Sequence, residues 1–333
     1  MSTPPGGTMC TALPAPVPGS IRRTLSLEVA PDPDWNAGLR VSALGRDLLA
    51  GTGPGSSRVI GTATMTITID TASRVTRIES GLPGTVTAPL IGAAAMRGFR
   101  ARLAGLTGLD PASLESAVLD ELPTVRLISG YARMIELSAG ADGAAERSAR
   151  RGQQAPTVGV CAGWAPGATA DRRFAAGASI VTGTPPAPSI TSMTPYFHAE
   201  PAPQPRSMRR RRILDVATRP DGPEVFAYFR DSHFDAGLRE GALHEYEVHA
   251  RAAADAGCTL KHLDVVPHAL PFGECPLAAP SAADLAGAPL SDVSATVKER
   301  LAGTRSCTHL NDTLRFLRYV PVLAELGKNE EGR

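Results

Sequence analysis

Residues 22–29 read RRTLSLEV, and residues 210–216 read RRRILDV. Each stretch opens a series of motifs that follow one another in the same order. LGRDLLAG, around Asp47, is matched by YFRDSHFDAG, around Asp231, and VTRIES (75–80) is matched by LKHLDV (260–265). The offset stays at about 185 residues across these matches, which predicts an internal duplication.

Strand patterns occupy the beginning of each copy. In ATMTITID (63–70) apolar residues alternate with threonines, which is the period of a half-buried strand, and TASR (71–74) then turns the chain into another strand. HEYEVHARA (244–252) and TLKHLDVV (259–266) repeat this hairpin in the second copy. Each copy is therefore predicted to contain an antiparallel sheet of about three or four strands.

Helical periodicity follows the strands in both copies. Apolar stripes lie at Leu114, Val118 and Leu122 in the first copy and at Leu310, Leu314 and Leu317 in the second. Together the patterns predict an α+β fold, in which two similar halves each carry helices on one face of an antiparallel sheet.

Composition divides the chain into five segments. Ala, Gly and Pro dominate the stretch between the copies, so we expect either a flexible linker or a strap that lies across both halves. VGVCAGW (158–164) is apolar enough to favour the strap, with Cys161 buried. The predicted segments are a disordered N-terminal tail (1–20), the first repeat (21–136), the strap or linker (137–205), the second repeat with the candidate site (206–322) and a polar C-terminal tail (323–333).

The overall charge argues against two classes of protein. A net charge of +1 is not that of a dedicated nucleic-acid or membrane-surface binder. No apolar stretch approaches the ~20 residues that cross a bilayer. The run Arg209–Arg212 is a local exception, for which a solvated strand end and phosphate binding are the alternatives. We expect a small-molecule partner, and the sequence leaves the oligomeric state open.

Cysteine usage and the N-terminal composition bear on the compartment. The five cysteines are scattered, which favours reduced thiols over a disulfide framework. The first twenty residues are rich in Pro, Gly, Ser and Thr and lack the basic and apolar regions of a signal peptide. These features predict a cytoplasmic protein.

Several motifs resemble a known bacterial family. SMRRRRILDV, FRDSHFD, HEYEV, LPFGECPLA and CTHLNDTLRFL are similar to domain-of-unknown-function family 2889, and CAGW in the middle segment resembles its actinobacterial members. The resemblance runs from about residue 20 to about 320 and is specific in the second repeat and loose in the first. It implies almost nothing about function, because none is assigned to the family.

A more distant resemblance is to the iron–sulfur scaffold fold of the IscU and NifU type. Strands followed by Cys275 at one helix start and Cys307 at another are similar to that fold, in which two such cysteines, a further cysteine and an aspartate bind zinc or a cluster. Here the earlier loop FRDSHFD supplies Asp231 and His233 but no cysteine. This departure puts cluster assembly in doubt and leaves a mononuclear metal site open.

The residues themselves also indicate a metal site. Pro276 follows Cys275, as at the first position of a helix, where the helix dipole favours thiolate. Cys307 stands in a similar place, with His309 just inside the helix. Two thiolates and an imidazole suit zinc or iron. The alternative is that both cysteines are small hydrophobic residues of the core and that no metal is bound.

Acid–base chemistry is predicted for a second set of residues. Asp231 and His233 lie two apart, hence on one face of a strand, and His244 opens the next strand. A carboxylate beside an imidazole is suited to proton transfer near neutral pH. The alternative is a salt-bridged sheet edge. We expect four further residues to contact the substrate, namely Arg230, Glu245, His268 and Asp312.

The first repeat lacks this polar set. It carries Asp47 at the place of Asp231, Leu90 at the place of Cys275 and no histidine. We therefore expect chemistry in the second repeat, on a small and largely apolar organic substrate, of the lyase, hydratase, isomerase or cyclase type. Actinobacterial secondary or aromatic metabolism is the expected setting. The alternatives are a metal or iron–sulfur carrier without turnover and an apolar-ligand binding protein.

Overall fold

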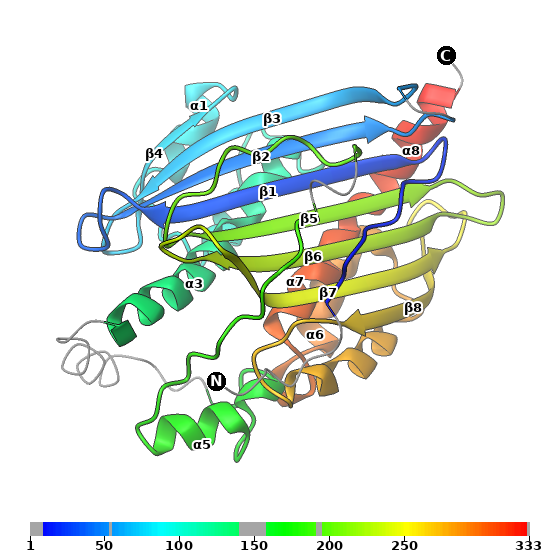
Figure 1. Ribbon diagram of the computed structural model, residues 1–333. Coiled ribbons are helices and arrows are strands. Elements are labelled where there is room, and N and C mark those ends of the chain that lie inside the picture. Colours follow the sequence, from blue (N-terminus) through cyan, green and yellow to red (C-terminus); the bar gives the residue numbers. More distant parts are fainter. Residues whose placement is uncertain (1–8, 53–54, 140–157, 191–194, 332–333) are drawn as a thin grey trace.

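The computed structural model describes residues 9–52, 55–139, 158–190 and 195–331. Its centre is one antiparallel sheet of eight strands, in the order β4-β3-β2-β1-β5-β6-β7-β8 (Figure 1). The strands are β1 (Ile21–Pro31), β2 (Leu39–Leu49), β3 (Arg58–Ile69), β4 (Val75–Ser80), β5 (Met208–Ala217), β6 (Glu224–Phe234), β7 (Glu240–Ala252) and β8 (Leu260–Pro267). The predicted antiparallel sheet with helices is confirmed.

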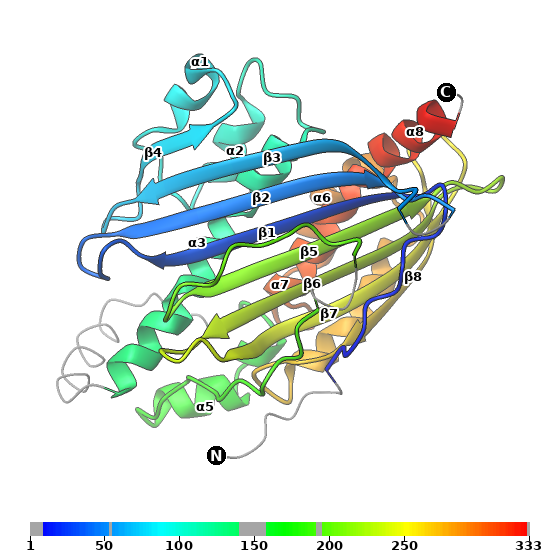
Figure 2. The same cartoon turned by 45° about the horizontal axis from the view of Figure 1, so that its top comes forward.

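The strand order is symmetric about the centre of the sheet. β1 pairs antiparallel with β5, and each begins a meander of four strands that runs outward to one edge. The two halves therefore share one continuous sheet instead of forming two separate ones (Figure 2). RRTLSLEV and RRRILDV are its two middle strands, with Arg22 opposite Asp215 and Glu28 opposite Arg209.

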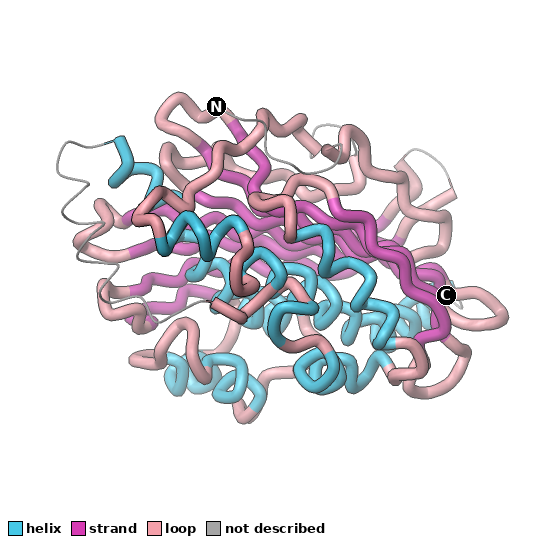
Figure 3. The backbone as a smooth tube through the Cα atoms, turned by 90° about the horizontal axis from the view of Figure 1, so that it is seen from below, coloured by secondary structure: helices cyan, strands magenta, loops and turns pink. Residues whose placement is uncertain are grey.

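Most helices lie on one face of this sheet, as Figure 3 shows. The long helix α3 (Leu114–Ala139) packs against β1, β2, β3 and β5, and α8 (Val320–Glu331) packs against β1 and β5. The other helical segments are α1 (Gly84–Thr87), η1 (Ala88–Leu90), α2 (Phe99–Ala104), η2 (Ala162–Trp164), α5 (Thr169–Ala175), η3 (Cys275–Leu285), η4 (Leu290–Asp292), α6 (Val293–Arg300), η5 (Gly303–Arg305), α7 (Thr308–Phe316) and η6 (Leu317–Tyr319).

The C-terminal end corrects one predicted boundary. Residues 323–333 were expected as a polar tail, but α8 continues to Glu331 and buries Leu323 and Ala324 against the sheet. The apolar residues VPVLA at the start of this helix supply its buried side. Among the described helices, none combines the length and apolarity that a membrane crossing requires.

Extended chain covers the opposite face of the sheet. Residues 9–20, predicted as part of a disordered tail, lie against the strands, with Cys10 and Leu13 buried. The described residues 158–190 and 195–205, here called the strap, contact both halves, and η2 near the beginning of the strap packs against η3 and η5. In the first half, Arg46 donates a hydrogen bond to the carbonyl of Tyr196 at 2.5 Å. In the second half, Pro186 of the strap forms an isolated antiparallel β-bridge with Gly241.

The arginine run is buried in the centre of the sheet, which corrects both predicted alternatives. Arg209 and Arg211 point toward the strap, where they bind Glu28, Glu200 and Glu240. Arg210 and Arg212 point toward the helices and are 0% exposed. Alternation along a strand, together with cover on both faces, explains how four consecutive arginines become core residues.

Candidate acid–base site

The site begins with a buried ion pair on the helix face. Arg210 of β5 and Asp231 of β6 stand opposite each other in the strand register. Arg210 donates from Nε to Oδ1 at 2.7 Å and from Nη2 to Oδ2 at 2.8 Å, and both residues are 0% exposed. A bulge follows Asp231 in the pairing with β7. The carboxylate is therefore fixed in position by a bidentate contact.

Two imidazoles lie beside this carboxylate. His244 stands opposite Asp231 on β7, and its Nδ1 lies 3.1 Å from Oδ2. The ring of His309, from the first turn of α7, stacks on that of His244 with 3.5 Å between centroids and 20° between planes. His309 is partly exposed, so the stack leads from a buried anion toward solvent.

The surroundings keep Asp231 ionised and His309 neutral. Burial by itself would raise the pKa of Asp231, but Arg210 and then His244 lower it well below its usual range. Burial, followed by the charge of His244, holds the pKa of His309 well below its usual range. A carboxylate that accepts from Nδ1 leaves the Nε2 lone pair of a neutral His244 free to accept a proton.

A network of charges anchors the site to the helices. Glu121 of α3 accepts from Arg210 at 3.1 Å and lies 2.7 Å from Arg212 Nε. Asp312 of α7 lies 3.5 Å from Arg210 and accepts from the hydroxyl of Thr124. The network thus ties β5, α3 and α7 together around the ion pair. Asp312 was predicted to contact substrate, and the structure places it in these contacts.

The three cysteines near the site are buried thiols. Cys161, Cys275 and Cys307 are 9%, 6% and 4% exposed, so the predicted burial of Cys161 is observed. Burial raises the pKa of Cys275 and Cys307, which is opposite to the predicted thiolate. Here desolvation outweighs any effect of the helix starts.

The predicted metal ligands do not come together as one group. Among the described residues, the group of His, Cys, Asp or Glu whose ligand atoms all lie within 4.8 Å of one another is Asp231, His244 and His309. Cys307 Sγ lies 4.0 Å from Nδ1 of His309. Cys275 belongs to no such group. Zinc or iron binding by Cys275, Cys307 and His309 remains a prediction that this geometry does not support.

His233 lies on the same face as Asp231, as the spacing predicted, but apart from the imidazole stack. Its ring contacts that of Tyr131 in α3 edge-on, with 5.8 Å between centroids. Burial lowers its pKa. The bulge after Asp231 shifts the register, so His233 faces Gly241 across the strands, with no side chain as a proton partner there.

Two predicted substrate contacts point the other way. Arg230 and Glu245 form a fully buried ion pair at 2.7 Å on the strap face, where Tyr228 donates to Glu245. Arg230 also donates to the carbonyls of Cys10 and Pro188. Residues 230 and 231 must face opposite sides of a strand, so one pocket cannot use both. His268 lies 3.1 Å from Glu247, away from Asp231.

Sequence patterns missed two further polar residues of note. Arg210 was not recognised as a partner of Asp231, although a similar pair, Arg23 with Asp47, stands at the matching place of the first repeat and was the available signal. His198 of the strap was not singled out. Its Nδ1 and Nε2 form hydrogen bonds with the hydroxyls of Thr24 at 2.8 Å and Ser26 at 2.7 Å.

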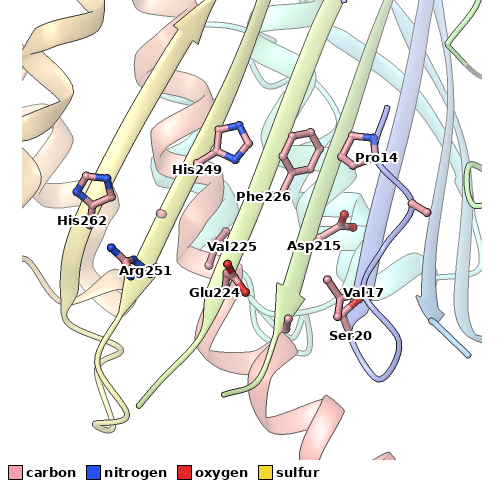
Figure 4. Close-up of a pocket in the computed structure, with 13 residues that line it drawn as sticks. Pro14, Val17, Ser20, Asp215, Glu224, Val225, Phe226, His249, Arg251 and His262 are labelled. Carbon is pink, nitrogen blue, oxygen red and sulfur yellow. The ribbon is translucent and has the colours of Figure 1, made fainter. Parts of the chain in front are cut away.

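A groove of about 300 Å³ lies on the strap face, between residues 14–20 and strands β5 to β7 (Figure 4). Phe226 and His249 line it from adjacent strands, with His262 at its margin. The side chains of His249 and His262 are 53% and 50% exposed. The sheet separates this groove from Asp231.

One of three comparisons with known proteins found a similarity. No curated protein and no solved structure matches the chain. Residues 208–322 match the model of a family described as "Protein of unknown function (DUF2889)". The matched span contains Arg210, Asp231, His244 and His309. This match supports the resemblance expected for the second half, and through that half the chain is similar to DUF2889.

Proposed function

We propose that the protein is an enzyme that moves protons through Asp231, His244 and His309. The observation that carries this proposal is a buried, ionised carboxylate that accepts from one imidazole, which is itself stacked on a second imidazole reaching solvent. Asp231 would fix the Nδ1–H tautomer of His244 and stabilise its charged form. His244 would then exchange a proton at Nε2 with a substrate.

The chemistry of the neighbouring side chains favours a small and largely apolar substrate. Cys307 at the start of α7 lies 4.0 Å from Nδ1 of His309. Tyr246 of β7 lies beside Cys307, and burial followed by Cys307 raises the pKa of the Tyr246 hydroxyl well above its usual range. Neutral thiols and a neutral phenol offer weak polar contacts and apolar surface. This fits the lyase, hydratase, isomerase or cyclase type. A cytoplasmic setting and actinobacterial secondary metabolism are part of the proposal.

A metal or iron–sulfur carrier is the second candidate, favoured by the 4.8 Å grouping of Asp231, His244 and His309. The residues fit a cation poorly. Both oxygens of Asp231 already accept from Arg210, and a divalent ion would lie beside a buried guanidinium. Cys275 is outside the group. The IscU-like donor set is therefore not reproduced, and we favour proton transfer.

We also propose that the two halves descend from one duplicated unit. The mirrored strand order supports this, as do reciprocal ion pairs across the central strands, Arg22 with Asp215 and Arg209 with Glu28. Bulges follow both Asp47 and Asp231. In this account the first half kept the arginine–aspartate pair and the second half added imidazoles.

The test uses exchange of solvent hydrogen, which acid–base enzymes of these classes catalyse. The protein would be incubated in D₂O with a pool of small metabolites, and deuterium incorporation would be measured by mass spectrometry. We expect a labelled compound with wild-type protein and at least ~100-fold less labelling with His244→Gln or Asp231→Asn. Asp47→Asn is the matched control and should label as wild type does.

Equal labelling by all four proteins, or labelling by none, would contradict the proposal. Metal analysis of the same purified wild-type protein separates the second candidate. About one zinc or iron per chain that is lost in His309→Gln would favour the carrier. A third function, binding of an apolar ligand without turnover, would give a retained compound but no deuterium.

A further inference from the structure

Three thiols from distant parts of the chain meet beside the start of α7. Cys161 belongs to the strap, Cys275 begins η3, and Cys307 is the residue before α7. Burial raises the pKa of Cys161 to about 11, and Cys307 is the next cause. Burial, then Cys307, and to a smaller extent Cys161 raise the pKa of Cys275. Each thiol therefore lies within electrostatic range of the others.

One backbone hydrogen bond holds the chain next to Cys161 close to the chain next to Cys307. The N–H of Ala162 donates to the carbonyl of Ser306 at 2.8 Å. This bond joins the residue after Cys161 to the residue before Cys307. Both cysteines are extended, with φ of −160° and −127°.

Between two antiparallel strands, the residues that flank such a bond lie opposite each other. A disulfide requires Cα atoms at about 4.4–6.8 Å. The Ala162–Ser306 bond holds the main chains next to Cys161 and Cys307 together, and this proximity is the geometric basis for a cross-link between them.

The strap packs tightly against η3 near Cys275. A Cβ atom added to Gly163 would lie 2.9 Å from Sγ of Cys275 and 3.3 Å from the ring of Phe272. The strap backbone therefore rests directly on the third thiol. That contact holds Cys275 beneath the strap, while Cys161 is joined by the backbone bond to the Cys307 segment.

We propose that Cys161 and Cys307 form a reversible disulfide that fastens the strap to the start of α7, two residues before His309. All five cysteines of the chain are free in the structure. The oxidant would be a low-molecular-weight disulfide. One protein thiolate attacks it and releases one thiol, and the second cysteine displaces the other, so two protein thiols and one disulfide give one protein disulfide and two small thiols.

Burial of the two thiols limits the rate at which this disulfide forms. The thiols are neutral and covered, so exchange requires the strap to loosen, and it should be slow and faster at higher pH. Once formed, the bond would close a loop of about 150 residues and oppose loosening of the strap. The inference concerns the strap and does not depend on the acid–base function.

The experiment treats the full-length protein with oxidised glutathione, alkylates the remaining thiols after denaturation, and maps the peptides by mass spectrometry. In the wild type we expect a cross-linked peptide pair containing Cys161 and Cys307, with about two glutathione molecules released per chain. Cys275→Ser should give the same pair. Cys161→Ala and Cys307→Ala should give no cross-link. The melting temperature of the oxidised wild-type protein should be higher than that of the reduced protein by at least about 2–4 °C.

Two results would overturn the proposal. One is a wild-type protein that keeps five alkylatable cysteines after prolonged oxidation. The other is a cross-link that contains Cys275 in place of Cys161 or Cys307. Cys258→Ala is a control at another buried cysteine and should leave the cross-link unchanged. It also separates loss of the bond from a general loss of folding.

Discussion

Both halves of the sheet contain a buried arginine–aspartate ion pair, but the residues around the two pairs differ. In the first half Arg23 donates to both oxygens of Asp47 at 2.8 Å, and in the second Arg210 does so to Asp231 at 2.7 and 2.8 Å. A bulge directly follows each aspartate. Across the next strand, however, Asp47 faces Gly61, whereas Asp231 faces His244.

In the proposed function, this difference separates the residues of the scaffold from the residues that transfer protons. Leu114 packs over Gly61 in the first half, while His309 stacks on His244 in the second. The arginine–aspartate pair is common to both and therefore belongs to the architecture of the sheet. Among the described residues, an imidazole lies next to the paired aspartate in the second half only. Substitutions at matched positions can test whether stability follows the shared pair and chemistry follows the added histidines.

The largest expected effect is on the shared pairs. Arg210→Met would leave Asp231 without its buried arginine and would remove one of the cations that contact Glu121 and Asp312, so it should lower the free energy of unfolding by about 3–5 kcal/mol. Arg23→Met removes the ion-pair partner of Asp47 alone. The side chain of Asp47 is 8% exposed and can be rehydrated, so we expect the free energy of unfolding to fall by about 2–3 kcal/mol. Urea unfolding of both variants checks the order, and a larger loss for Arg23→Met would contradict it.

A pH effect of similar size is expected where the strap meets the first half. Burial lowers the pKa of His198 to about 4, with Arg46, Arg211 and Arg209 adding to this and Glu200 opposing it. The unfolded chain takes up the proton near pH 6.5, so stability is full above that pH and falls as the pH drops toward 4. The difference corresponds to about 3 kcal/mol.

Unfolding free energies at pH 7 and pH 4.5 measure this contribution. His198→Gln should lose less stability over that interval than wild type does. His262→Gln, at an exposed histidine on β8, is the control and should behave as wild type. An unchanged pH dependence in His198→Gln would contradict the assignment.

A smaller effect is expected where the strap meets the second half. Gly163→Ala would place its Cβ 2.9 Å from Sγ of Cys275, closer than real Cβ contacts, and should cost about 1–3 kcal/mol. Cys275→Ala removes that sulfur, so the double variant should recover most of the loss. Thermal unfolding of the three proteins tests this, and an additive double variant would show that the two residues do not touch.

The smallest effect is expected at Gly61, the counterpart of His244. A Cβ there would meet Leu114 at 3.4 Å and Asp47 Cβ at 3.9 Å, which is ordinary contact. Gly61→Ala should therefore change stability by less than about 1 kcal/mol and by about 0.5 kcal/mol in the stabilising direction. Chemical denaturation measures it. A large loss would mean that glycine is required at this bulge.

Local periodicity predicted the strands and helices because each element repeats its pattern within a few residues. The pairing of β1 with β5 depends on residues about 190 positions apart, and no local pattern specifies it. The prediction that the N-terminal segment is disordered and that the C-terminal segment is a polar tail was wrong because a few buried residues, such as Cys10 and Leu323, pack these segments against the sheet.

The candidate site was predicted in part. Asp231 and His244 were predicted as catalytic and His309 as a ligand, and the structure places the three together. Strand alternation alone could have excluded Arg230 and Glu245, since Asp231 and His244 are their chain neighbours and face the other way. Arg210 required the long-range pairing of β5 with β6. The stack of His309 on His244 required the position of α7, which no local pattern contains.

The central claim is that Asp231 fixes the tautomer of His244 and that the first half has no part in it. Long-range ¹H–¹⁵N NMR of the histidine rings reports directly which nitrogen carries the proton. The account predicts that neutral His244 is protonated at Nδ1 in wild type and in Asp47→Asn, and that Asp231→Asn loses this preference. Protonation at Nε2 in the wild type, or the same tautomer in Asp231→Asn, would contradict it.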